Sequence, residues 1–326
     1  MSARLSFRHV ILIIAATACW GGGTVLSKQV LERGVAPLTL LVIELAASCL
    51  LLLGSMIVLR TAWSRGPALG KLAMLGILNP GLAYALGLLG LATVSASMAV
   101  LLWGTEPVLI LVLAMLLLRE RVAAATGLGI VAALVGVLLV IYRPGAGGDP
   151  IGLALTAAAV TACACYTVLT RRWLLDDSSL LVALVQQAVA LAFAVVVAGG
   201  SSLLGLVDLS PPVGVGTWLL AAASGAVYYG LAFWFYVSGL RGVPASVAGA
   251  FLPLIPVFGL AAAYLVGDRL VDRQLLGAGL VILATATVAV RHLTRGSGSG
   301  EERPADARTV DIDPTAFNTD GGGAAH

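Results

Sequence analysis

The stretch from Gly81 to Val122 reads GLAYALGLLGLATVSASMAVLLWGTEPVLILVLAMLLLRERV, and a related stretch recurs later in the chain. Aligned without a gap on Gly230 to Val271, it is identical at fifteen of forty-two positions. Leucine and alanine are common throughout the chain, but other matches involve rarer residues: Gly81 with Gly230, Gly90 with Gly239, Ser97 with Ser246 and Pro107 with Pro256. Self-similarity of this kind indicates that one structural unit occurs twice.

The composition around this stretch is typical of a membrane protein. Of the 326 residues 60% are hydrophobic and 11% are charged, whereas a soluble protein has roughly a quarter of its residues charged. Continuous apolar runs such as Ile110 to Leu118 differ from the alternating pattern of a transmembrane β-barrel. Because a membrane-spanning helix needs about 20 mostly apolar residues, we expect an all-α integral membrane protein with ten transmembrane helices. The expected spans lie near residues 9–27, 37–59, 71–91, 95–118, 123–142, 151–170, 179–198, 214–237, 245–266 and 272–290.

A second match between the two parts of the chain lies in the first and sixth spans, where Thr24 to Lys28 resembles Thr167 to Arg171. The spans therefore form two five-helix repeats, and an odd number of spans makes the second repeat enter the membrane in the opposite direction. Such inverted repeats are common in alternating-access transporters, whose solute site lies near mid-membrane between the halves. The expected domains are a first repeat at 1–142, a linker at 143–150, a second repeat at 151–290 and a flexible cytoplasmic tail at 291–326.

The distribution of Lys and Arg predicts how the spans are oriented. With a cytoplasmic N-terminus, fourteen of the nineteen positive residues lie on the cytoplasmic side and five on the opposite side. We therefore expect both termini to be cytoplasmic. Arg4 and Arg8 before an apolar run are also typical of a signal peptide, but the run continues past Trp20 and favours an uncleaved first span. A net charge of +3, spread over short loops, does not favour a nucleic acid partner.

Several motifs resemble those of the EamA-type transporters of the drug/metabolite transporter superfamily. In the first repeat these are Trp20-Gly21, the run from Ala96 to Val108, and Arg119-Glu120-Arg121-Val122. Their counterparts in the second repeat are Ala245-Ser246-Val247-Ala248, Pro256-Val257 and Gly267-Asp268-Arg269-Leu270. The resemblance covers about residues 9–290. It implies a carrier of the bacterial cytoplasmic (inner) membrane, often one that exports amino acids or other small metabolites.

Two carboxylates lie within the expected spans: Glu44 in the second, and Glu106 near the middle of the fourth. A charge at mid-bilayer costs roughly 2.5 to 3.5 kcal/mol on insertion scales, so each is expected to face the bundle interior or a watery cavity. Either could bind an amino group or carry a proton; the alternative for Glu106 is a protonated group hydrogen-bonded to a neighbouring span. EamA-type proteins commonly carry arginine near the place of Glu44, and this reversal of sign favours a cationic or zwitterionic solute. The repeat places Gln187 opposite Glu44.

Aromatic and polar side chains within the spans complete the predicted substrate-binding set. An aromatic wall can hold an apolar or cationic group, although Trp and Tyr also gather at membrane interfaces, and polar residues often only join helices. Trp103 precedes Glu106 by three residues and shares its helical face. Pro107 and Pro256 are predicted hinges, with plain kinks as the alternative. The full set is Trp20, Glu44, Asn79, Tyr84, Trp103, Glu106, Gln187, Tyr228 and Trp234.

The favoured function is a secondary transporter of a small organic solute. No G-x-x-x-x-G-K-[ST] motif for ATP occurs, and no cofactor or metal is expected. An intramembrane enzyme is one alternative, but the three histidines, His9, His292 and His326, lie at span ends or in the tail. A receptor or scaffold without transport is another, although the longest soluble segment is the tail. The expected partners are the solute and the lipid bilayer, with protons as an optional coupling ion.

Overall fold

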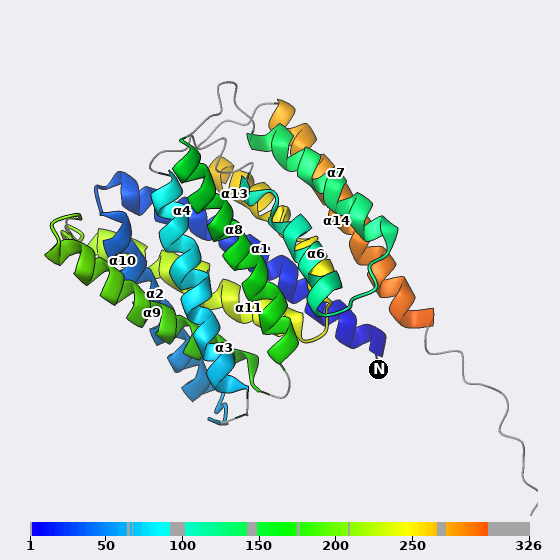
Figure 1. Ribbon diagram of the computed structural model, residues 1–326, viewed down its shortest axis with the longest axis horizontal. Helices are drawn as coiled ribbons and strands as arrows, with labels where there is room; N and C mark the ends of the chain where they lie inside the picture. The colour runs from blue at the N-terminus through cyan, green and yellow to red at the C-terminus, as the bar shows by residue number, and fades with distance from the viewer. Residues whose placement is uncertain are drawn as a thin grey trace, which may run out of the picture.

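The protein is a bundle of apolar helices (Figure 1). The computed structural model describes residues 2–63, 66, 68–91, 102–141, 149–174, 177–207, 209–265 and 272–298. Within these residues, eight helical stretches are long and apolar enough to cross a membrane, and two shorter apolar helices, Glu106–Leu117 and Ala124–Leu139, bring the number to ten. The predicted fold class, an all-α membrane protein with two inverted five-helix repeats, is confirmed.

The helices follow the expected spans in order. The first repeat contains α1 (Ser2–Glu32), α2 (Pro37–Val58), α3 (Leu69–Gly76), η1 (Ile77–Leu82), α4 (Ala83–Leu91), α6 (Glu106–Leu117) and α7 (Ala124–Ile141). The second contains α8 (Pro150–Trp173), α9 (Ser179–Leu203), α10 (Val215–Gly225), η2 (Ala226–Leu231), α11 (Ala232–Leu240), α12 (Ala245–Gly249), α13 (Leu254–Leu265) and α14 (Asp272–Gly298).

The third and eighth spans each contain a π-helical segment at the same place in the repeat. The segments η1 and η2 begin at residues 77 and 226 and end at 82 and 231, so they coincide when Gly81 is aligned with Gly230. In η1, Pro80 has no backbone N–H to donate, and Asn79 has an extended backbone with φ −150° and ψ 123°. Such π-helical turns occur frequently at functional sites.

The fourth and ninth spans are interrupted at equivalent positions. Glu106, expected near the middle of the fourth span, is instead the first residue of α6 and follows a turn at Gly104 and Thr105. The ninth span is interrupted at residues 250–253, between α12 and α13, and the repeat aligns these residues with 101–104. Each helix resumes with a proline in its first turn, Pro107 in α6 and Pro256 in α13, where a missing N–H leaves no helical hydrogen bond unmade.

The two repeats interlock instead of forming separate bodies. The first helix of one repeat, α1, packs against α10, α11 and α13 of the other, while α8 packs against α3, α4 and α6. The equivalent helices α2 and α9 pair with each other, and so do α7 and α14, which lie side by side at one edge of the bundle (Figure 1). Two sets of helices result. We call α1, α10, η2, α11 and α13 the α1 group, and α8, α3, η1, α4 and α6 the α8 group.

Small residues allow the close contact between α7 and α14. A Cβ atom on Gly129 would collide with Val288, and one on Gly136 would collide with Val281 and with the Gly277 carbonyl. This agrees with the sequence, in which Gly and Ala recur at four-residue spacing along the fifth span, a pattern typical of close helix packing in membranes.

A polar contact joins the end of the fourth span to the interrupted ninth span. The Glu120 carboxylate accepts hydrogen bonds from the backbone N–H groups of Ala245 and Ser246, at 2.9 and 3.1 Å, and from the Ser246 hydroxyl at 2.5 Å. It therefore satisfies N–H groups at the start of α12 that have no partner within the helix.

The last helix continues to Gly298, past the expected end of the span at residue 290. Residues 299–326 of the predicted tail and 143–148 of the predicted linker lie outside the described residues. At the end of the linker, Asp149 caps α8 by accepting from the backbone N–H groups of Ile151 and Gly152, at 3.0 and 3.3 Å.

Candidate functional site

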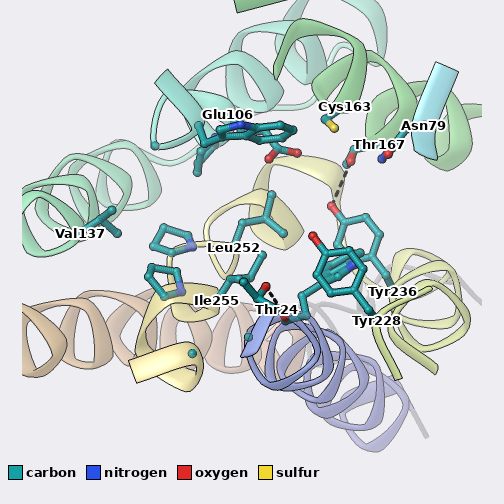
Figure 2. Close-up of a pocket in the computed structure, with 18 of the residues that line it drawn as sticks. Thr24, Asn79, Glu106, Val137, Cys163, Thr167, Tyr228, Tyr236, Leu252 and Ile255 are labelled. Atoms are coloured by element: carbon teal, nitrogen blue, oxygen red, sulfur yellow. Dashed lines mark hydrogen bonds between the residues drawn. The ribbon is translucent and has the colours of Figure 1, made fainter. Parts of the chain in front are cut away.

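A cavity of about 400 Å³ lies between the α1 group and the α8 group. Figure 2 shows two sides of the open space. The α8 group contributes Asn79, Glu106, Cys163 and Thr167. The opposite side has Thr24, Tyr228 and Ile255 of the α1 group, together with Leu252 from the turn before α13. The volume falls within the range of roughly 300 to 1,000 Å³ that is typical of small-molecule sites.

The lining of this cavity follows the internal repeat. Trp20 corresponds to Cys163 and Thr24 to Thr167 in the alignment of the first and sixth spans, and both members of each pair line the cavity. Further lining pairs follow from the alignment of Gly81 with Gly230: Asn79 with Tyr228, Tyr84 with Phe233, Trp103 with Leu252, Gly104 with Pro253, Glu106 with Ile255, and Pro107 with Pro256. Many of the residues that line the cavity therefore occupy equivalent positions in the two repeats.

Glu106 brings the charge to this site. It is the only acidic or basic residue among the described residues that line the cavity. Its carboxyl group points into the open space in Figure 2. Among the described residues, no ion pair involves Glu106, and no basic residue lies on the described lining. The undescribed residues 92–101, just before it in sequence, read ATVSASMAVL and include no basic residue.

Aromatic rings form much of the cavity wall. The Trp20 ring packs edge-on against Phe233 and Tyr236, with centroids 5.4 and 5.1 Å apart, and the Tyr84 ring packs against Tyr228 at 5.9 Å. Hydrogen bonds between hydroxyl groups link side chains of the wall. Tyr84 donates to Tyr228 at 2.9 Å, and Tyr236 shares a 3.1 Å hydrogen bond with Thr167. The rings thus hold one another in fixed orientations around the cavity.

Two buried polar atoms on the cavity wall have no hydrogen-bond partner in the described structure. They are the Trp20 indole nitrogen, a donor, and Asn79 Oδ1, an acceptor. The two side chains are only 8% and 7% exposed. Buried polar groups normally have partners, and an unpaired one costs about 1–3 kcal/mol, so these atoms are available to a bound molecule.

Glu44 lies outside the cavity lining, although it was predicted as a substrate-binding residue. Its side chain is 4% exposed, and Oε1 accepts hydrogen bonds from the hydroxyls of Ser27 and Ser224, each at 2.6 Å. Ser27 belongs to α1 and Ser224 to α10. The carboxyl group therefore joins three helices in the interior of the bundle.

Two further predicted residues also lie away from the cavity. Gln187, the repeat counterpart of Glu44, is buried and donates from Nε2 to the Tyr229 carbonyl at 3.3 Å. Trp234 packs against the apolar cluster around Leu52 and Leu181. The structure brings together the others, namely Trp20, Asn79, Tyr84, Trp103, Glu106 and Tyr228 with the predicted hinges Pro107 and Pro256.

Several lining residues were missing from the predicted set. Thr24 lies one helical turn after Trp20, and Thr167 lies one turn after Cys163, so helical spacing applied to the repeat would have found them. Tyr166, Phe233 and Tyr236 also line the cavity. Among the described residues, no group of three His, Cys, Asp or Glu side chains could hold a metal ion.

The fold and the cavity define a class of protein: a multi-pass helical membrane protein whose inverted repeats surround a central solute-sized cavity. The EamA-like transporter family matches residues 7–142 and 150–290, one copy to each repeat, and the chain belongs to this family. It is thus a multi-pass membrane transporter of the drug/metabolite transporter superfamily.

Relatives agree with this assignment. The chain is 29% identical over 231 residues to the Uncharacterized transporter YyaM of Bacillus subtilis (strain 168), a match covering 66% of this chain and 72% of that protein. It is 25% identical over 295 residues to Protein PecM of Dickeya dadantii (strain 3937), covering 89% and 94%. A solved crystal structure with 20% identity superposes with a TM-score of 0.73 over 86% of this chain and 98% of its own, which shows the fold.

Proposed function

We propose that the protein is a secondary transporter that exports a small organic solute, an amino acid or a related metabolite, by alternating access. The observation that supports this is the cavity between the α1 group and the α8 group, whose lining residues are paired by the repeat. Alternating access requires two arrangements of the helices, similar in energy, around one solute site. Repeats that contribute equivalent residues to both cavity walls are suited to form these two arrangements.

In the proposed cycle the α1 group and the α8 group move against each other, and each contains helices of both repeats. Pro107 and Pro256 act as hinges, because α6 and α13 begin beside them and both prolines line the cavity. The backbone interruptions there are tolerated because they face a cavity and not lipid. The cycle uses neither ATP nor a catalytic step.

The proposed setting is the bacterial cytoplasmic membrane, with both termini in the cytoplasm. The excess of Lys and Arg on the expected cytoplasmic side, fourteen against five, supports this orientation. Protons are the proposed coupling ion, since Glu106 is a carboxyl group on the cavity lining that can bind and release a proton.

Solute exchange in proteoliposomes tests the proposal. Purified protein is reconstituted, loaded with each member of a panel of amino acids and amines, and assayed for uptake and efflux with and without a pH gradient. We expect exchange of at least one solute, and we expect Glu106→Gln to reduce it. The matched control is Glu32→Gln, which neutralises an exposed carboxylate that is not part of the cavity lining. Folded protein that exchanges no member of the panel would contradict transport of this solute class.

A further inference from the structure

We infer that the transported solute carries a net positive charge on an ammonium group and has no carboxylate, so that amines are preferred over amino acids. This inference rests on the proposed function, and it selects one solute class within it. It follows from the charges, hydrogen-bonding groups and rings of the cavity wall.

The charge of the wall is unbalanced. Glu106 is the one acidic or basic residue on the described lining, and no basic side chain of the described chain lies within ion-pair distance of it. A carboxyl group removed from water is stable when it is protonated or when its charge is paired with a cation. An ammonium group supplies that pairing, whereas an amino acid has no net charge and brings a second carboxylate into the same space.

The free hydrogen-bonding groups favour the same solute. An ammonium ion has only donors and a carboxylate only acceptors. The wall offers Asn79 Oδ1 as a buried acceptor without a partner, in addition to the Glu106 carboxyl group. The only unpartnered buried donor described on the wall is the Trp20 indole nitrogen. The other donors of the described lining, such as the Thr24 hydroxyl and the Asn79 amide group, are neutral as well, so a solute carboxylate meets no cationic donor there.

The aromatic walls favour a cation as well. The faces of Trp and Tyr rings carry negative partial charge and attract ammonium groups within about 6 Å of the ring centroid. Trp20, Trp103, Tyr228 and Tyr236 are among the aromatic residues that line the cavity together with Glu106. The same faces repel an anion. Ring faces and the Glu106 carboxylate therefore act in the same direction.

Four related probes separate the alternatives by binding to purified full-length protein in detergent. These are 2-phenylethylamine, L-phenylalanine, 3-phenylpropanoate and 2-phenylethanol, which share a phenyl ring and differ in charge. We expect the amine to bind at least about tenfold more tightly than the other three, which corresponds to one charged hydrogen bond. Phenylalanine or phenylpropanoate binding as tightly as the amine, or no binding of the amine at millimolar concentration, would overturn the inference.

Substitution of Glu106 tests whether this residue causes the preference for the amine. We expect Glu106→Gln to weaken amine binding about tenfold to a hundredfold and to leave 2-phenylethanol unchanged, while Glu32→Gln changes neither. If Glu106→Gln does not fold, as judged by size-exclusion chromatography, Glu106→Asp and the four-probe comparison on the natural protein decide. Amine affinity that is unaltered in a folded Glu106→Gln protein overturns the inference.

The failure of this inference and that of the transport proposal give different results. Selective amine binding with no exchange of any solute in proteoliposomes contradicts transport alone. Exchange of amino acids without any preference for amines contradicts the ammonium inference alone.

Discussion

Glu44 and Glu106 are both single carboxylates within apolar spans, and their surroundings differ. Glu106 begins α6 and faces the cavity without a basic partner in the described chain. Glu44 is enclosed by α1, α2 and α10 and accepts from Ser27 and Ser224. The Glu106 carboxyl group thus faces a cavity of solute size, whereas the Glu44 carboxyl group joins three helices.

Glu44→Gln is therefore expected to reduce stability more than solute affinity. An amide oxygen accepts weaker hydrogen bonds than a carboxylate, and the loss at the two serines is of the order of 1–3 kcal/mol. The apparent unfolding temperature in detergent measures the first effect, and the dissociation constant for 2-phenylethylamine measures the second. A variant that unfolds like the natural protein and yet loses the amine would show that Glu44 acts on the solute.

Trp103 and Trp234 provide a matched pair for the aromatic wall. Trp103 lines the cavity, and its repeat counterpart is Leu252, whereas Trp234 packs in the cluster around Leu52. We expect Trp103→Leu to weaken amine binding about twofold to thirtyfold, the value of one cation–π contact, and Trp234→Leu to leave it unchanged. Equal losses in both variants, measured on folded protein, would argue against a direct contact at Trp103.

At the scale of helices, the crossing of α1 and α13 depends on one glycine. A Cβ on Gly21 would lie 2.5 Å from the Ile255 carbonyl oxygen and 2.6 Å from the Gly259 nitrogen, whereas a Cβ on Gly22 would meet nothing within 4 Å. The α1 backbone can therefore approach α13 closely only because residue 21 has no side chain.

The two neighbouring glycines thus make a controlled test. We expect Gly21→Ala to destabilise the protein by about 1–3 kcal/mol, because overpacking forces the helices apart. Gly22→Ala should be neutral or slightly stabilising, since alanine favours a helix over glycine by about 1 kcal/mol. Thermal unfolding of both variants in the same detergent gives the comparison. Similar unfolding temperatures would mean that α1 and α13 do not cross as described.

The existence of the helices was predictable and their interruptions were not. Hydropathy is summed over about 20 residues, so ten spans and two repeats could be read from the chain. The π-helical segments η1 and η2 and the late start of α6 depend on packing between helices, which a single span does not reveal. Likewise, sequence marks Glu44 and Glu106 equally as costly carboxylates, whereas the rotation of each helix decides which one faces the cavity.

At the scale of the whole molecule, the orientation in the membrane can be tested with single cysteines. In a variant lacking Cys19, Cys49, Cys163 and Cys165, cysteine is introduced at Arg33 or at Ala62, both exposed in loops at opposite ends of α2. We expect a membrane-impermeant thiol reagent added to intact cells to label Arg33→Cys. Ala62→Cys should react only after the membrane is opened. The reverse pattern would invert the proposed topology.

The pairing of Glu106 with Ile255 across the repeat has a consequence for how a solute can be held. A dimer of two identical five-helix chains must place either two carboxylates or none in a central cavity, and it offers every solute two equivalent poses. Joining the units in one polypeptide allows one copy to keep the acid while the other becomes apolar. On the amine inference, the nitrogen of the solute is expected to lie toward Glu106 of α6 and its apolar end toward Ile255 of α13. Fusion of the two units thus allows the two sides of the cavity to differ, one acidic and one apolar, which two identical, symmetrically placed subunits do not allow.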